Sequence, residues 1–188
     1  MATQQSSTHK ILIIFAHPSP QQSRVNRPLL EEVQSTPEIE IVDLYEEYPD
    51  FYIDTSREQQ RLVAADLIVF HHPFYWYSAP AILKHWQDQV LEERFALREG
   101  GFALKGKKLM SMVTVGHSKQ SYQLDGYDRF PIETFLLPYE QMAFHCGMQY
   151  LAPFVVYSAH RVTESEIKVQ ARNYRQHLLN HLSASDNE

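Results

Sequence analysis

Five short runs of apolar residues recur along the chain, and the stretches between them carry apolar residues at helical spacing. The first run, at 11–15, has no polar alternation, which is typical of a strand buried on both faces of a sheet. The run at 39–42 alternates more, which predicts a strand nearer an edge. The last run follows Pro153, which we expect to mark the start of its strand. The predicted strands lie at residues 11–15, 39–42, 67–70, 108–115 and 154–157.

Helices are expected in the gaps between these strands, at residues 25–35, 57–65, 80–90, 132–145 and 164–182. Ser78 stands just before Pro80 and is expected to cap the third helix, because proline is tolerated in the first turn. Thr163 and Glu166 match a capping box for the last helix. This alternation predicts an α/β fold, a flavodoxin-like doubly wound sheet of five parallel strands with helices on both faces.

Composition narrows the class of protein further. At 188 residues and 44% hydrophobic, the chain suits one domain, which we place at 9–182, with a disordered lead-in at 1–8 and a disordered tail at 183–188. A net charge of -6 argues against nucleic acid as a partner. Cys146 is the single cysteine and no stretch approaches the roughly 20 apolar residues that span a bilayer. We therefore expect a cytoplasmic protein.

The turn after the first strand gathers groups that suit a phosphate. His17 is followed by Ser19, Ser23 and Asn26, so hydroxyl, amide and backbone N–H donors stand just before a helix N-terminus, where an anion is favoured. A plainer interpretation has equal weight on local chemistry alone. In it, Ser23 only caps the helix and His17 bonds a neighbouring carbonyl.

Four consecutive aromatic residues, Phe74, Tyr75, Trp76 and Tyr77, follow the third strand. They cannot all point inward at the end of one strand, so some of them must cover a ligand or a partner. Stacking on the flat ring of a flavin would explain such a loop. An interface between two copies of the chain would explain it too, and one loop can serve both purposes.

A third loop, after the fourth strand, holds Thr114, Gly116, His117 and Tyr122, and it would flank the other side of such a ring. Gly116 permits close approach of the backbone. The segment 116–120 begins like the nucleophile elbow of a serine hydrolase but lacks the final glycine, so that class is set aside. Together the three loops predict a flavin pocket at the carboxyl edge of the sheet.

The ten histidines do not predict a metal site. His71 and His72 are neighbours in a strand, so their side chains point to opposite faces. No Cys-x-x-Cys or His-x-x-x-His spacing completes a site. We expect no metal.

With these residues in view, nearly the whole chain resembles the flavodoxin-like NAD(P)H quinone reductases, and among them the ancillary subunits of glutathione-gated potassium efflux systems. The resemblance rests on the segments 14–18, 43–54, 57–60, 70–80 and 82–90. It implies a flavin, FMN in preference to FAD, with NAD(P)H as co-substrate. It also implies a homodimer.

The resemblance assigns contacts to these loops. Phosphate contacts would come from His17, Ser23, Arg24, Val25 and Asn26, and ring contacts from Phe74, Tyr75, Trp76 and Tyr77. The segment Thr114, Val115, Gly116 and His117 is similar to the family's Thr-Thr-Gly-Gly segment. Val115 and His117 depart from it, and the imidazole of His117 would crowd the flavin edge or the nicotinamide slot.

Tyr122 falls where the resembled quinone reductases carry a catalytic tyrosine, whose phenol would stabilise charge during hydride transfer. The alternative is a surface tyrosine in a mobile loop. The family's partner histidine appears here as Asp128, a poor proton donor near neutral pH, which puts a two-residue acid relay in doubt.

The resemblance therefore implies a flavin-dependent NAD(P)H oxidoreductase that passes two electrons to a quinone-like acceptor by a ping-pong hydride mechanism. The alternative is a regulatory ancillary subunit of a potassium efflux transporter, with weak or vestigial catalysis. That subunit would lie on the inner face of the cell membrane.

Overall fold

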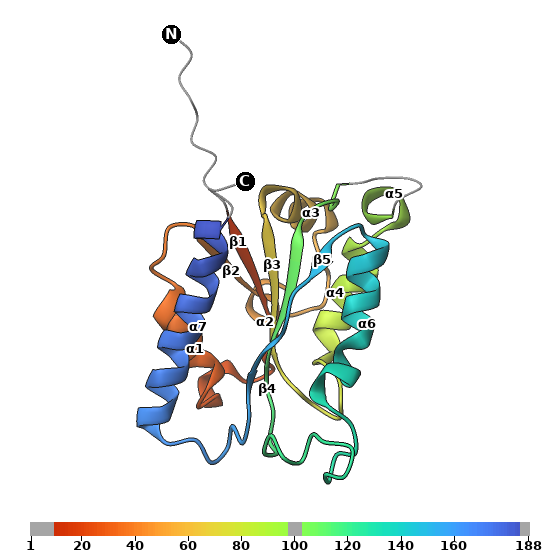
Figure 1. Ribbon diagram of the computed structural model, residues 1–188. Coiled ribbons are helices and arrows are strands. Elements are labelled where there is room, and N and C mark those ends of the chain that lie inside the picture. The colour runs from red at the N-terminus through yellow and green to blue at the C-terminus, as the bar shows by residue number, and fades with distance from the viewer. Residues whose placement is uncertain (1–9, 98–102, 185–188) are drawn as a thin grey trace.

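A parallel β-sheet forms the centre of the structure, a computed structural model that describes residues 10–97 and 103–184 (Figure 1). The strands lie in the order β2 (Ile39–Asp43), β1 (Ile11–Phe15), β3 (Leu67–Pro73), β4 (Lys108–Thr114), and all neighbours are parallel. Beyond β4 lie two short segments, β5 (Gln149–Tyr150) and β6 (Phe154–Val156), and both pair with β4. The predicted doubly wound α/β fold is confirmed.

The two short segments together fill the fifth position of the sheet. Lys108 pairs with Gln149 and Met112 pairs with Phe154, so the edge carries one residue more than β4 between these points. The extra residue falls in the segment that contains Pro153, which cannot donate to a ladder. The expected start of a strand after Pro153 is confirmed, whereas β5 was not expected.

Helices cover both faces of the sheet, as Figure 1 shows. One face packs against α1 (Asn26–Val33) and α7 (Glu164–Ala184), through strand residues such as Ile13 and Val69. The other face packs against α3 (Thr55–Ala64), α4 (Ala81–Val90) and α6 (Ile132–His145), through neighbours of opposite orientation such as Ile14 and Phe70. Alternate side chains of the buried strands therefore serve two separate cores.

Three short elements and the cap of one helix differ from the sequence prediction. The short elements η1 (Pro20–Gln22), α2 (Leu44–Glu47) and α5 (Glu93–Ala96) were not expected. Ser78 does not cap α4, because Pro80 occupies the N-cap and the backbone of Ser78 is paired with Tyr75 instead.

The capping box at the start of α7 is confirmed. The backbone N–H of Thr163 donates to Glu166 Oε2 at 2.8 Å, and that of Glu166 donates to Thr163 Oγ1 at 3.3 Å. Helix α7 continues to Ala184, two residues past the domain end expected at 182. Of the expected disordered ends, residues 1–8 and 185–188 lie outside the described residues.

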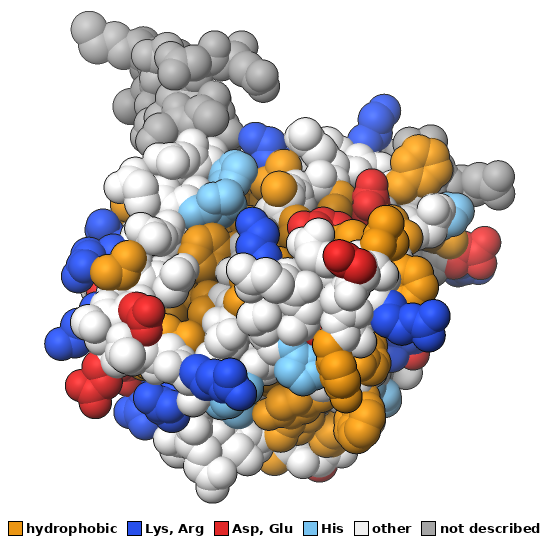
Figure 2. Space-filling view, turned by 60° about the horizontal axis from the view of Figure 1, so that its bottom comes forward, with side chains coloured by type: hydrophobic (Ala, Val, Ile, Leu, Met, Phe, Trp, Pro, Cys, Tyr) orange, Lys and Arg blue, Asp and Glu red, His pale blue; other side chains and the backbone are white. Residues whose placement is uncertain are grey.

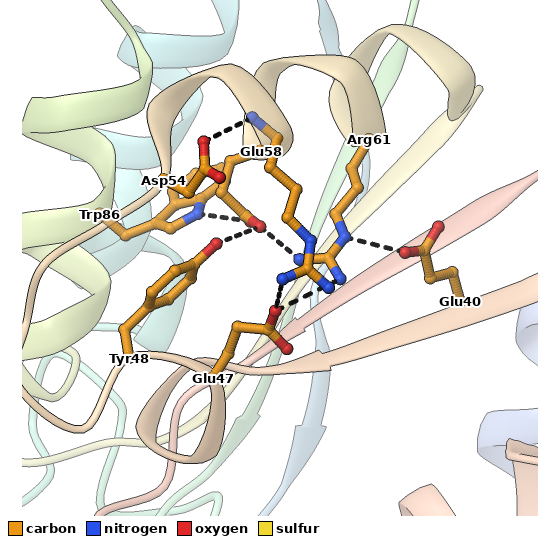
Figure 3. Close-up of polar contacts among 8 residues, drawn as sticks. Glu40, Glu47, Tyr48, Asp54, Glu58, Arg61 and Trp86 are labelled. Carbon is orange, nitrogen blue, oxygen red and sulfur yellow. Dashed lines mark hydrogen bonds and ion pairs between the residues drawn. The ribbon is translucent and has the colours of Figure 1, made fainter.

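One buried carboxylate ties three elements together on the α3–α4 side of the sheet (Figure 3). Glu58 of α3 is fully buried and accepts hydrogen bonds from Tyr48 Oη and Trp86 Nε1, each at 2.8 Å. It also forms an ion pair with Arg61, which in turn contacts Glu40 of β2 at 2.9 Å. The charge is therefore matched by donors from α3, α4 and the segment after α2.

Candidate functional site

The loops that leave the carboxyl ends of β1, β3 and β4 meet at one end of the molecule, which lies at the bottom of Figure 1 and faces the viewer in Figure 2. Three contacts join them. The rings of His17 and Tyr75 lie 6.4 Å apart between centroids, the N–H of Phe74 donates to Thr114 O at 2.9 Å, and Asn26 Nδ2 donates to Thr114 Oγ1 at 3.0 Å. The candidate site residues from the three loops thus form one cluster.

His17 presents one ring nitrogen to the inside of its own loop. The backbone N–H of Ser19 donates to His17 Nδ1 at 3.0 Å, so the proton of the neutral ring sits on Nε2. The ring is buried, and burial lowers its pKa, which favours the neutral form. His17 therefore does not bond a neighbouring carbonyl through Nδ1, and its Nε2–H remains as a donor for an anion.

Ser23 Oγ accepts the backbone N–H of Asn26, the first residue of α1, at 3.0 Å, although Val25 occupies the N-cap position. Asn26 is buried, and its two amide hydrogens go to Ser23 Oγ and Thr114 Oγ1, each at 3.0 Å. Its Oδ1 lies 3.2 Å from His71 Nε2. Asn26 therefore orients the first and third loops through contacts inside the protein.

His71 was not predicted as a site residue, although its ring contacts Asn26 inside the protein. Its Nδ1 lies 3.3 Å from Tyr174 Oη of α7, and both side chains are fully buried. Burial, with the neighbouring His72 and His17, lowers the pKa of His71 well below its usual value. The neutral ring is thus a fixed link between Asn26 and α7, a role that the strand pattern alone could not reveal.

The side chains of Arg24 and Val25 have partners inside the protein. The Arg24 guanidinium donates to the carbonyls of His160 and Val162, at 3.1 and 3.2 Å, and fastens the loop after β6 beside the first loop. The side chain of Val25 is buried in the core under α1 and α7. Either residue would contact a ligand through its backbone.

The aromatic loop forms a tight turn. Tyr75 and Ser78 exchange backbone hydrogen bonds at 2.9 and 3.0 Å, and the two residues between them, Trp76 and Tyr77, have φ of 48° and 63°. Left-handed backbone is unfavourable for such bulky residues, and strain of this kind clusters at functional sites. Trp76 is 93% exposed, whereas Phe74 packs inward against Tyr122 and Phe135.

In the third loop, Val115 is buried in the core and Gly116 lies at the surface. The His117 side chain is half-exposed, and its Nδ1 lies 2.9 and 3.0 Å from the two carboxylate oxygens of Asp128. Tyr77 Oη donates to the same carboxylate at 3.4 Å. Asp128 thus joins the aromatic loop to the third loop, a contact that spacing along the chain did not predict.

Tyr122 is 5% exposed, so it is not a surface tyrosine. Burial first, and then the charge of Asp128, raise the pKa of its phenol to about 12. The phenol stays protonated near neutral pH and is available as a hydrogen-bond donor. Gly126 supports this loop, because a Cβ there would lie 2.3 Å from the carbonyl oxygen of Ser121.

The loop after β6 also borders the site, and sequence reasoning missed it. The ring of Tyr157 lies 5.9 Å from that of Tyr122, and the N–H of Ser158 donates to His117 O at 2.9 Å. His160 Nδ1 lies 3.7 Å from the position that a Cβ on Gly116 would take. This loop follows the fifth strand, and ligands bind at the carboxyl ends of parallel strands, so its position along the chain could have predicted that it borders the site.

Neither a metal centre nor a membrane span is found in the part of the chain that the structure describes. Across residues 10–97 and 103–184, no group of three or more His, Cys, Asp or Glu side chains is placed to hold a metal ion. His71 and His72 face opposite sides of β3, towards Tyr174 and Tyr139 respectively. None of the helices in these residues is both long and apolar enough to cross a membrane.

Comparison with protein families and curated proteins supports this architecture. The family model described as "Flavodoxin-like fold" matches residues 9–178. The glutathione-regulated potassium-efflux system ancillary protein KefG of Pectobacterium atrosepticum is 44% identical over 173 residues, which cover 92% of this chain and 94% of that protein. KefG of Yersinia pestis is 43% identical over 169 residues, covering 90% and 93%.

Solved structures give the same picture. General stress protein 14 of Treponema denticola, in complex with FMN, has 35% identity and a TM-score of 0.84, covering 93% of this chain and 98% of that one. An NADPH-quinone reductase from P. pentosaceus has 28% identity and a TM-score of 0.82, covering 89% and 96%. Both likenesses cover about nine tenths of this chain or more.

Proposed function

This chain belongs to the flavodoxin-like fold family, and we propose that it is a flavin-dependent NAD(P)H oxidoreductase that passes two electrons to a quinone-like acceptor. The observation that carries the proposal is the meeting of the three loops, through His17, Tyr75, Asn26 and Thr114, at the carboxyl edge of the sheet. The likeness to an NADPH-quinone reductase over most of both chains supports it.

The donor set of these loops fits a flavin. His17 offers an Nε2–H in the loop that leads to the N-terminus of α1, which suits a phosphate. The exposed faces of Trp76 and Tyr77, with the backbone around Gly116, suit a flat ring with a polar edge. When bound, the flavin supplies hydride chemistry, with NAD(P)H and the acceptor using one site in turn.

We propose FMN in preference to FAD. The structure of the 35% identical general stress protein 14 was solved with FMN, which supports this choice. The chain's own part is to bind and orient. Tyr122, buried and protonated, donates a hydrogen bond towards developing charge, and Asp128 holds the third loop against Tyr77.

A second function is favoured by the curated relatives. KefG proteins at 43–44% identity are named as ancillary to a potassium-efflux system, so this chain is proposed to bind such a transporter at the cytoplasmic face of the membrane. Docking and catalysis can coexist on one fold. In the strictly regulatory form of this alternative, turnover is weak or vestigial.

The test is an absorbance titration of the purified protein with FMN, followed by anaerobic NADPH or NADH and then by 1,4-benzoquinone. We expect a bound flavin spectrum that bleaches with the nicotinamide and returns with the quinone. A His17→Leu variant should bind FMN about tenfold more weakly, a loss of about 1.4 kcal/mol. His145→Leu, at the exposed end of α6, is the matched control and should bind normally. Absence of FMN binding by the wild-type protein would refute the proposed oxidoreductase activity and would leave the regulatory subunit as the remaining proposal.

A further inference from the structure

Asp128 is a buried carboxylate with few partners. Its side chain is 1% exposed, and within the described residues its side-chain hydrogen bonds come from His117 and Tyr77. Taking a carboxylate out of water is unfavourable unless donors compensate it. The close contact with His117, 2.9 and 3.0 Å to the two oxygens, therefore constrains the position of both side chains.

The contact fixes which nitrogen of His117 faces outward. Nδ1 is directed at Asp128, and the ring lies edge-on against Tyr127, with centroids 5.2 Å apart and planes at 85°. Nε2 forms no hydrogen bond with any of residues 10–97 or 103–184, and the side chain is half-exposed. A carboxylate on Nδ1 holds the imidazole in one tautomer and leaves Nε2 free to exchange a proton.

His117 lies among the loops of the candidate site. It comes three residues after the end of β4, and its carboxylate partner also accepts from Tyr77 of the aromatic loop. Its ring lies 6.4 Å from that of Tyr122, between centroids. Tyr122 is buried and its pKa is raised to about 12, so it is a weak acid. Of the two side chains, that of His117 is half-exposed, whereas Tyr122 is buried.

We propose that His117 Nε2 delivers the proton that the acceptor takes up during reduction, and that Asp128 is a positioning residue that orients the imidazole. This inference rests on the proposed function. Reduction of a quinone to a hydroquinone consumes one hydride, which originates on NAD(P)H, and one proton, which leaves Nε2 of the doubly protonated His117 ring for the acceptor oxygen, while the Nδ1 proton stays hydrogen-bonded to Asp128. The imidazole then regains its proton from water, so NAD(P)H, one proton and quinone give NAD(P)⁺ and hydroquinone.

The experiment compares two acceptors in the His117→Gln variant of the FMN-loaded protein. Glutamine can still donate a hydrogen bond to Asp128 but cannot transfer a proton. With 1,4-benzoquinone, reoxidation should slow about 100-fold, the lower end of the range for general acid catalysis. With ferricyanide, which accepts electrons without a proton, the loss of rate should be much smaller than with the quinone. His145→Gln is the control and should change neither rate.

An equal loss with both acceptors would show that His117 has only a structural role. An unchanged quinone rate would show that His117 takes no part in quinone reduction. Either result overturns the inference while the proposed function stands. A wild-type protein that oxidises NAD(P)H with neither acceptor contradicts both.

A second measurement needs no flavin. In the cofactor-free protein, the ¹⁵N NMR shifts of the His117 ring should report a proton on Nδ1 in the neutral form. In Asp128→Asn, the amide can donate to Nδ1, so the proton should move to Nε2. Asp125→Asn removes one charge from an exposed site in the same loop and should leave the tautomer unchanged. A wild-type ring with its proton on Nε2 would refute the positioning role of Asp128.

Discussion

At the scale of single residues, the buried histidines of β3 make stability depend on pH. His72 is fully buried, its Nδ1 bonds Pro73 O at 2.9 Å, and its Nε2 has no hydrogen-bond partner among residues 10–97 and 103–184. Burial lowers its pKa from 6.5 to about 4. The folded protein therefore binds fewer protons than the unfolded chain between these values. The stability that the neutral ring provides is full above pH 6.5 and is lost as the pH falls towards 4.

Replacing His72 with Phe should make the folded protein less sensitive to acid. One pKa unit corresponds to about 1.4 kcal/mol, so the His72 contribution to acid destabilisation reaches about 3 kcal/mol. Urea unfolding at pH 7.5, 5.5 and 4.5 should show a shallower loss of stability for the variant than for the wild type. His145→Gln, at an exposed position, should follow the wild-type curve. Parallel curves for wild type and His72→Phe would contradict this account.

The sequence identified the loops of the candidate site better than it identified the role of each residue in them. The clustering of His17, Tyr75 and Thr114 follows from the rule that parallel strands end at one edge. The contact between His117 and Asp128 does not, because the two are eleven residues apart in irregular backbone that has no periodicity to read. The burial of Tyr122 depends on the same irregular loop.

At the scale of elements, Glu58 holds α3 against α4 and the segment after α2. Removing one partner of a buried charged cluster leaves the others without compensation, which typically costs about 3–5 kcal/mol. Glu58→Ala should therefore lose about that much stability in urea unfolding, because Tyr48 and Trp86 would lose their acceptor and Arg61 would lose one of its carboxylate partners. Glu31→Ala breaks an exposed pair with Arg27 and should lose less than about 0.5 kcal/mol. Similar losses for the two variants would contradict a central role for Glu58.

The sequence predicted the long strands of the sheet better than the short elements between them. Long apolar runs predicted β1, β3 and β4, because strands buried on both faces leave a continuous signal. The elements it missed are short: α2 and α5 have four residues each and β5 has two, too few for a period to show. The capping role expected of Ser78 failed because the residue pairs with Tyr75 across a tight turn.

At the scale of the whole molecule, helix α6 has apolar residues on two sides. Its inner side buries Ile132, Leu136 and Ala143, yet Leu137 and Phe144, seven residues apart and so on one stripe, are 51% and 57% exposed. A helix that is apolar on both sides is normally covered on both. This stripe supports the proposed homodimer, with α6 in the contact.

Leu137→Glu should accordingly shift the protein towards monomer in analytical ultracentrifugation, because a carboxylate would be buried in the contact. Val169→Glu places the same charge at an exposed position of α7, which covers the opposite face of the sheet, and should leave the dimer intact. A wild-type protein that sediments as a monomer, or a Leu137→Glu dimer as tight as wild type, would contradict the assignment of α6.

The interruption at Pro153 has a consequence for the behaviour of the protein at high concentration. An open sheet presents unpaired backbone groups along its outer strands, and another chain can extend the sheet there and start an aggregate. Here the segment with Pro153 divides one edge strand into pieces of two and three residues. These pieces are too short, and too far out of register with each other, to pair with a further strand. The opposite margin, β2, carries Glu40 in its ion pair with Arg61. The irregular fifth position of the sheet thus disfavours pairing with a strand of another chain, and so disfavours aggregation.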